Sequence, residues 1–353
     1  MPGPKEVAMI SAQKYPNTKR IVDDMLEWVR GRGKIVIIVH DNPDPDCLAS
    51  AMALRHLFIM KLNRDAVIAF SGMIARSENV AMAKELEILL TPLGLVNIKD
   101  YQVVCMLDTQ PATGNNSLPP GSRVDIVIDH HPLKDLSKQC RWVDVRDDYG
   151  VTATILYEYL VAEKITIGTK LATALFYAIK SETQDLGRES NRPDKDAYLR
   201  LFPLTNKKLL YEITHPKLSK EYFLIVNTAL ENTEIYDKIV VINLGTIMFP
   251  EIVAEMADFL LRLEGIETVL CMGQYVGEMI FSTRTIRHDL NMGEVVKRLV
   301  SGIGTAGGHG MMAGGKVDDI PAEAKAISET GNLLTSRLLA EFGLNTLKPS
   351  KLI

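Results

Sequence analysis

Acidic and histidine side chains crowd the point where one strongly apolar run of this sequence ends. The run is Ile35–Val39, five apolar residues without helical periodicity, which predicts a short buried strand. His40 follows directly, and Asp41, Asp44 and Asp46 come within the next six residues. Prolines between these aspartates prevent a helix, and a helical pattern begins only after them. The acidic loop therefore joins the carboxyl end of a strand to a helix, which is where open α/β sheets bind ligands.

Carboxylates this close in sequence repel one another, and a bound cation is the usual way to stabilise them. A simpler alternative is that Asp44 or Asp46 serves only as the N-cap of the following helix. One cap does not require three carboxylates and a histidine, so a cation site is the interpretation that we favour.

The same arrangement occurs at two later positions. The apolar run 101–107 is followed by Asp108, and the strand predicted within 122–132 ends in the run Asp129–His131. An aspartate after one strand is commonly a turn residue, but three strands that all end in candidate ligands indicate one shared site. Residues 150–180 predict two helices, so strands and helices alternate as in an α/β fold with a parallel sheet.

Composition excludes several classes of protein. The 353 residues are 46% hydrophobic and 24% charged with a formal net charge of −4, so no global basic field attracts long nucleic acid. No apolar run approaches a membrane span and no signal-peptide core begins the sequence, so we expect a cytoplasmic protein without a membrane partner. The cysteines indicate neither a zinc site nor a disulfide framework, and their scatter suits a reducing compartment. They are Cys47, Cys105, Cys140 and Cys271.

The length predicts two domains, each large enough to bury its own core. Residues 1–190 contain the strands with candidate ligands, and residues 191–237 are charged and helix-prone, as in a connector. Strands return in residues 238–353, including a long apolar run over 268–284, and the glycine-rich segment 302–317 follows. We therefore expect a ligand-carrying domain, a helical connector and a smaller α/β domain.

Four motifs occur in a fixed order: HDNPDPD at 40–46, LDT at 107–109, IDHHP at 128–132 and GGHGMMAGG at 307–315. Together they resemble the DHH phosphoesterase superfamily, and the glycine-rich motif resembles its DHH-associated C-terminal domain. The subgroup that the chain resembles acts on very short oligonucleotides and nucleoside 3′,5′-bisphosphates. The resemblance implies an N-terminal parallel-sheet domain, a smaller C-terminal α/β domain and an active site in the cleft between them.

The resemblance also implies a centre of two divalent cations. His40 and Asp44 would hold one ion, Asp46 and His130 the other, and Asp108 would bridge them. Imidazole and carboxylate ligands without thiolate suit Mn²⁺, with Mg²⁺ as the alternative.

The fourth metal-binding motif of the family has no unambiguous counterpart. The family has an Asp-Thr pair there, and this chain has SETQDLG at 181–187. If the family's threonine is aligned with Thr183, the ligand is Glu182. If the ligand must be an aspartate, as in the family, it is Asp185. We favour Asp185 slightly, because its shorter side chain keeps the usual reach, and retain both.

Further residues are expected around the substrate. By the resemblance, Asp129 would orient a histidine, and His131 would donate a hydrogen bond beside the phosphate or the nucleophile. Arg284 matches the family's phosphate-contacting arginine, and Arg287 is a second candidate. The glycine-rich segment would expose backbone N–H groups to an anion, although a flexible turn is the alternative. Its candidate residues are Gly307, Gly308 and His309.

The expected activity is two-metal hydrolysis of very short oligonucleotides, including linear dinucleotides, or of nucleoside 3′,5′-bisphosphates. An exopolyphosphatase or pyrophosphatase is the rival enzyme, and a non-catalytic nucleotide sensor is the rival of another class. We expect a nucleotide or short oligonucleotide as partner and no long duplex nucleic acid. The sequence does not determine the oligomeric state, and a homodimer is a candidate.

Overall fold

Six parallel strands form the sheet that carries the candidate ligands. The computed structural model describes residues 16–74, 76–188 and 190–353, and its first sheet has the strand order β3-β2-β1-β4-β5-β6 with every neighbouring pair parallel. The strand predicted over 35–39 is confirmed as β1, and the runs before Asp108 and His130 form β4, beside β1, and β5, beside β4. The strands are β1 (Ile35–Val39), β2 (Ala66–Phe70), β3 (Leu90–Pro92), β4 (Val103–Leu107), β5 (Ile126–Asp129) and β6 (Trp142–Val145).

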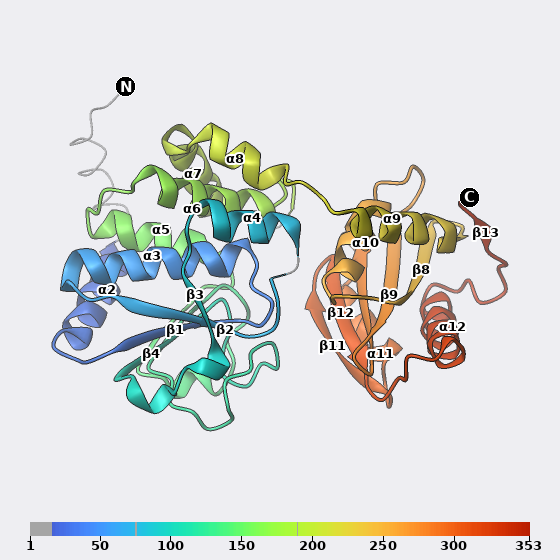
Figure 1. Ribbon diagram of the computed structural model, residues 1–353, viewed down its shortest axis with the longest axis horizontal. Helices are drawn as coiled ribbons and strands as arrows, with labels where there is room; N and C mark the ends of the chain where they lie inside the picture. The colour runs from blue at the N-terminus through green and yellow to red at the C-terminus, as the bar shows by residue number, and fades with distance from the viewer. Residues whose placement is uncertain (1–15, 75, 189) are drawn as a thin grey trace. The chain divides into compact units, whose positions relative to one another are not determined.

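This sheet is buried on both faces. Successive side chains of a strand point to opposite faces, and all five residues of β1 are buried. Ile35 and Ile37 belong to the large core cluster that the helices share, whereas Val36 and Ile38 lie in a smaller cluster with loop residues. Figure 1 shows α3 lying along the helix-covered face. The helices are α2 (Pro16–Val29), α3 (Pro45–Leu62), α4 (Ser77–Glu85), α5 (Thr152–Ala162), α6 (Thr169–Glu182), α7 (Arg192–Leu201) and α8 (Lys207–Thr214).

The chain divides into two units, Met1–Pro216 and Lys217–Ile353. The segment 191–237, predicted as a connector, is largely helical, but it is shared between the units. Helices α7 and α8 belong to the first unit, and α9 (Lys220–Asn232) belongs to the second. The reason is packing: α7 contacts α6, whereas α9 packs on a strand of the second sheet.

The second unit contains a mixed sheet of seven strands in the order β11-β12-β10-β9-β8-β7-β13. Only β8 and β9 pair in parallel; the other neighbours are antiparallel. The apolar run 268–284 is a hairpin, because Val276 and Gly277 adopt positive φ and reverse the chain. The strands are β7 (Glu234–Tyr236), β8 (Ile239–Thr246), β9 (Thr268–Tyr275), β10 (Glu278–Thr285), β11 (Gly304–His309), β12 (Met312–Val317) and β13 (Ser350–Lys351).

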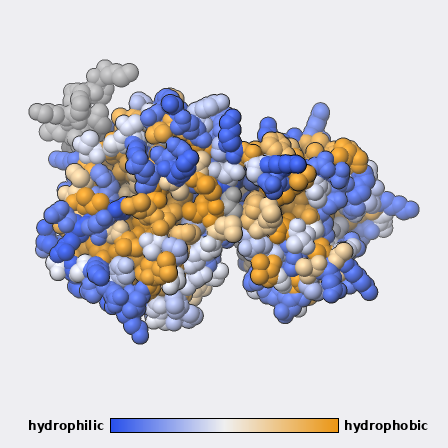
Figure 2. All heavy atoms as spheres, viewed as in Figure 1, coloured by the Kyte–Doolittle hydropathy of each residue, from blue (hydrophilic) through white to orange (hydrophobic). Residues whose placement is uncertain are grey.

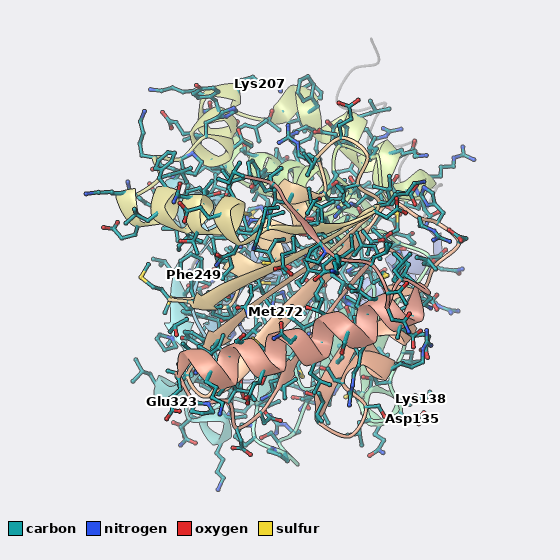
Figure 3. All side chains as sticks on the ribbon, turned by 90° about the vertical axis from the view of Figure 1, so that its right-hand side faces the viewer. Asp135, Lys138, Lys207, Phe249, Met272 and Glu323 are labelled. Carbon is teal, nitrogen blue, oxygen red and sulfur yellow. The ribbon has the colours of Figure 1, made fainter. Side chains whose placement is uncertain are left out.

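Two layers of helices cover this sheet. Helices α9 and α10 (Ile252–Leu260) pack on one face, and α11 (Met292–Leu299) and α12 (Ala324–Glu341) pack on the other. Figure 3 shows α12 crossing the face of the sheet at Met272, which shares a core cluster with Leu334 and Leu338 of that helix.

The glycine-rich segment is a β-hairpin rather than a loop. Strands β11 and β12 pair from Gly304↔Val317 to His309↔Met312. A Cβ atom at Gly315 would lie 2.4 Å from the Thr305 carbonyl oxygen, and one at Gly293 would lie 2.0 Å from the Gly308 oxygen. The glycines therefore allow backbones to approach closely within the second unit.

Hydrophilic and apolar residues are interspersed over the face of each unit that Figure 2 shows. Among the described residues, no helix is long and apolar enough to cross a membrane.

Candidate metal centre

The ends of three adjacent strands bring the candidate ligands together. His40 follows β1, Asp108 follows β4, and His130 follows β5. Asp108 has a left-handed main chain, with φ of +58°, which turns the chain sharply as the strand ends. Its Oδ2 atom lies 3.6 Å from His40 Nε2, and its Oδ1 atom lies 3.6 Å from His130 Nε2. The two oxygens of one carboxylate therefore face two different histidines.

Both histidines are oriented by backbone carbonyl groups. His40 Nδ1 lies 2.8 Å from the Asp41 oxygen, and His130 Nδ1 lies 3.2 Å from the Tyr149 oxygen. A carbonyl only accepts hydrogen bonds, so Nδ1 carries a proton in each ring, and Nε2 is the nitrogen that faces Asp108. Histidine ligands of metals are commonly held in this way.

Asp44 has two roles at once. Its Oδ1 atom accepts a hydrogen bond of 3.0 Å from Cys47 N and caps helix α3, while its Oδ2 atom lies 3.3 Å from His40 Nε2. Burial opposes ionisation of Asp44, but His40 lowers the pKa of this carboxyl to about 2. The N-cap and the cation-site interpretations are thus compatible for this residue.

Asp46 is buried at the start of α3 and is held by the N-terminus of α5. Its two oxygens accept hydrogen bonds of 2.8 Å from Thr152 N and 2.7 Å from Ala153 N. Thr152 Oγ1 also donates to Asp108 Oδ1 at 2.9 Å. Thr152 has no local signal in the sequence, because it lies 106 residues from Asp46 and acts through its main chain as well as its hydroxyl.

Asp129 lies behind His131 and fixes its orientation. Asp129 Oδ1 accepts from His131 Nδ1 at 2.9 Å, and Asp129 Oδ2 accepts from Gln110 Nε2 at 2.7 Å. Burial lowers the pKa of His131, but the Asp129 hydrogen bond and the charges of Asp108 and Asp129 together outweigh it and raise this pKa to about 9. Gln110 is fully buried and was not predicted; its only sequence signal is its position two residues after Asp108.

Glu182 and Asp185 have different surroundings. Burial, Asp44 and Asp108 raise the pKa of Glu182 to about 8. Asp185 is exposed, forms an ion pair with Lys180 and accepts from the Tyr198 hydroxyl at 2.9 Å. Positive φ over 184–186 turns the chain directly after α6. These surroundings favour Glu182 over Asp185 as the candidate ligand, and the choice between them stays a prediction.

The donors fit divalent cations. Burial, Asp108 and Asp44 raise the pKa of Asp46 well above its usual value, so the protein itself supplies too little positive charge for these carboxylates. Within the described parts of the chain, two groups could hold an ion: His40 with Asp44 and Cys47, and Asp108 with His130 and His131. Imidazole nitrogens and carboxylate oxygens are ligands that suit Mn²⁺ and Mg²⁺.

The substrate-binding candidates lie in the second unit. Arg284, on β10, is mostly buried and donates to Asp258 Oδ1 at 2.9 Å and to Ser282 Oγ at 2.7 Å. Arg287 is partly exposed and pairs with Asp289. Gly307 and Gly308 are exposed on β11, and the side chain of His309 lies outside the described part of the structure. The substrate roles of these residues remain predictions.

Comparison with known proteins identifies both domains. Residues 34–179 match the DHH family, N-terminal domain, and residues 236–335 match the DHHA1 domain. The uncharacterised Methanocaldococcus jannaschii protein MJ1633 is 35% identical over 288 residues, which cover 81% of this chain and 58% of that protein. The chain thus spans little more than half of that relative. MJ0988 of the same organism is 23% identical over 336 residues, covering 90% of this chain and 98% of that protein.

Two solved structures have a similar fold. One is an exopolyphosphatase-related protein from Bacteroides fragilis, with a TM-score of 0.69 and 17% identity, covering 91% of this chain and 98% of that chain. The other is RecJ in complex with Mn²⁺ from Thermus thermophilus, with a TM-score of 0.52 and 13% identity, covering 95% of this chain and 55% of that chain. With both domains matched in order, this chain belongs to the DHH superfamily, as a DHH domain followed by a DHHA1 domain.

Proposed function

We propose that this protein is a metal-dependent phosphohydrolase that acts on very short oligonucleotides, including linear dinucleotides, or on nucleoside 3′,5′-bisphosphates. The observation that carries the proposal is the position of Asp108, whose two oxygens face His40 Nε2 and His130 Nε2 at the same distance of 3.6 Å. A carboxylate placed in this way suits a bridging ligand of two ions, and paired divalent ions are a common solution for phosphoryl chemistry.

In this proposal the cluster divides into two ion positions. His40 and Asp44 hold the first ion, Asp46 and His130 hold the second, and Asp108 is shared. Glu182 supplies a further carboxylate, since Asp44 and Asp108 are the residues that raise its pKa after burial. Two divalent ions would polarise the phosphoryl oxygens and make a neutral-pH nucleophile from water.

His131 is proposed to serve the phosphate rather than the metals. Its Nδ1 atom is engaged by Asp129, and the raised pKa keeps the ring protonated near neutral pH. A protonated imidazole can donate a hydrogen bond to a phosphate oxygen or a proton to the leaving oxygen. Asp129 stabilises that positive charge and is held by Gln110.

A hydrolysis panel tests this proposal. The purified chain, with Mn²⁺ or with chelator, is given dinucleotides, an oligomer of about twenty nucleotides, a 3′,5′-bisphosphate, cyclic dinucleotides and polyphosphate, and products are separated by chromatography. We expect Mn²⁺-dependent release of nucleoside monophosphate from dinucleotides or of inorganic phosphate from the bisphosphate. Faster polyphosphate cleavage would favour an exopolyphosphatase. Nucleotide binding without turnover, with Mn²⁺ bound, would favour a sensor.

A further inference from the structure

A thiol lies among the donors of the first ion position. Cys47, in the first turn of α3, is fully buried. Its Sγ atom, a ring nitrogen of His40 and a carboxylate oxygen of Asp44 all lie within 4.8 Å of one another. Sγ also lies 3.4 Å from the main-chain oxygen of Asp44. The sulfur is therefore held at the edge of the cluster.

Two distances between these donors match the edge of a four-coordinate site. His40 Nε2 lies 3.3 Å from Asp44 Oδ2 and 3.6 Å from Asp108 Oδ2. Tetrahedral ligands about 2.0–2.2 Å from a zinc ion are separated by about 3.3–3.6 Å, the edge of the tetrahedron. The Cys47 sulfur, within 4.8 Å of the His40 and Asp44 donor atoms, adds a third kind of donor at this position.

Simple core packing is the competing explanation, because buried cysteines commonly behave as small hydrophobic residues. Cys105 in β4 and Cys271 in β9 fit that description, since both are fully buried within strands. Among the described residues, neither belongs to a group of potential metal ligands, and Cys47 does. Cys47 also lies in the large core cluster, so what distinguishes it from the other two is its place beside His40 and Asp44.

We propose that Cys47 is a sulfur ligand of the first ion position and makes that position selective for thiophilic divalent ions such as Zn²⁺, Co²⁺ or Cd²⁺ over Mg²⁺. This inference rests on the proposed metal centre. The metal–sulfur bond forms as the thiol loses its proton to solvent. The second position, with His130, Asp46 and Asp108, has no sulfur and keeps the preference of nitrogen and oxygen ligands. The two positions would then differ in the ion that they prefer.

Cobalt provides a direct test, because a thiolate ligand gives Co²⁺ a near-ultraviolet charge-transfer band. Metal-free full-length chain is titrated with Co²⁺ alone, and the band is expected in the wild type and absent in Cys47→Ala and Cys47→Ser. Cys47→Ser nearly preserves the shape of the side chain, and circular dichroism confirms folding of each variant. Cys140→Ser is the matched control, since Cys140 is partly exposed in the same unit and belongs to no such group; its band should remain.

Competition titrations measure the selectivity. Cys47→Ala should lower the affinity for Cd²⁺ by about 10-fold or more and change the affinity for Mn²⁺ by less than about 3-fold. The inference is overturned if wild-type protein binds Co²⁺ without the band, or if the band survives in Cys47→Ala. In either case Mn²⁺ binding and hydrolysis by the wild type would leave the proposed function standing. If no divalent ion binds the wild type, both proposals are overturned.

Discussion

At the scale of single residues, Asp108 is the carboxylate proposed to link the two halves of the metal centre. We expect Asp108→Asn to lower turnover by about 10²-fold or more, because an amide offers one neutral oxygen where two charged oxygens face His40 and His130. Mn²⁺ stoichiometry by calorimetry and initial rates would measure the effect. Asp135→Asn is the control, since its carboxylate is exposed on a surface loop beside Lys138 (Figure 3). Wild-type turnover in Asp108→Asn would contradict the assignment.

The choice between Glu182 and Asp185 is tested by paired substitutions that preserve size. Glu182→Gln should weaken Mn²⁺ binding by about 10–100-fold, because this carboxylate lies within the field of Asp44 and Asp108. Asp185→Asn should bind and hydrolyse almost as the wild type does, because Asp185 pairs with Lys180 and Tyr198. If Asp185→Asn loses Mn²⁺ affinity and Glu182→Gln does not, Asp185 is the ligand.

The stability of the metal-free protein should depend on pH through Glu182. Burial and nearby carboxylates raise its pKa from 4.5 to about 8, so the folded state holds a proton that the unfolded state releases. The stabilising contribution is complete below the unfolded pKa and is lost as pH rises through the folded pKa. We therefore expect the gain in Tm on adding Mn²⁺ to grow between about pH 5 and pH 8. Thermal melts of Glu182→Gln should show a smaller change, and a constant gain across this range would contradict the prediction.

At the scale of elements, the segment 146–154, the turn after β6 and the first residues of α5, holds the candidate metal centre from one side. It presents the Tyr149 carbonyl to His130 and the first amides of α5 to Asp46. Asp194 of α7 is fully buried and fixes this turn, accepting from Gly150 N at 2.9 Å and from Thr154 Oγ1 at 2.7 Å. A helix remote in sequence therefore supports the ligands through the main chain.

Asp194→Asn tests this support. In the wild type, Gly150 N and Thr154 Oγ1 donate to the two charged oxygens of Asp194. Asparagine offers only one neutral oxygen in their place, so we expect the free energy of unfolding to fall by about 1.5–3 kcal/mol. Mn²⁺ affinity should fall as well, because the turn that orients His130 and Asp46 is loosened. Urea unfolding with and without Mn²⁺ measures both effects. Lys195→Gln, an exposed change on the same helix, should alter stability by less than about 0.5 kcal/mol, and equal stability of the two variants would count against this role.

At the scale of the whole molecule, the net charge limits the length of nucleic acid that we expect the protein to bind. The formal net charge is −4, so binding of a long strand gains no general electrostatic attraction. We expect the highest rates for about two to four nucleotides and a shallow dependence of binding on salt, as for one or two phosphate contacts. Rates measured at several salt concentrations against oligomer length would test this. Degradation of an oligomer of about twenty nucleotides as fast as a dinucleotide would point to a long-strand exonuclease.

The placement of ligands after strands could be predicted because the signal is local. An apolar run followed by a polar residue marks a strand end, and His40, Asp108 and Asp129 each follow or end such a run. The parallel sheet follows from the alternation of strands and helices, and the order of four motifs indicated the family. These features need only neighbouring residues and their sequence order.

Tertiary structure alone decided the surroundings of those ligands. Thr152 meets Asp46 across 106 residues and Asp194 meets Gly150 across 44, contacts that no local pattern encodes. Glu182 and Asp185 differ by three positions, and their different surroundings, a field of carboxylates and an ion pair with Lys180, depend on the fold. The sequence by itself thus determined which edge of the sheet carries the candidate ligands, because the apolar runs that mark the ends of strands are local. The partners that orient each donor depended on packing between distant elements, which only the folded chain specifies.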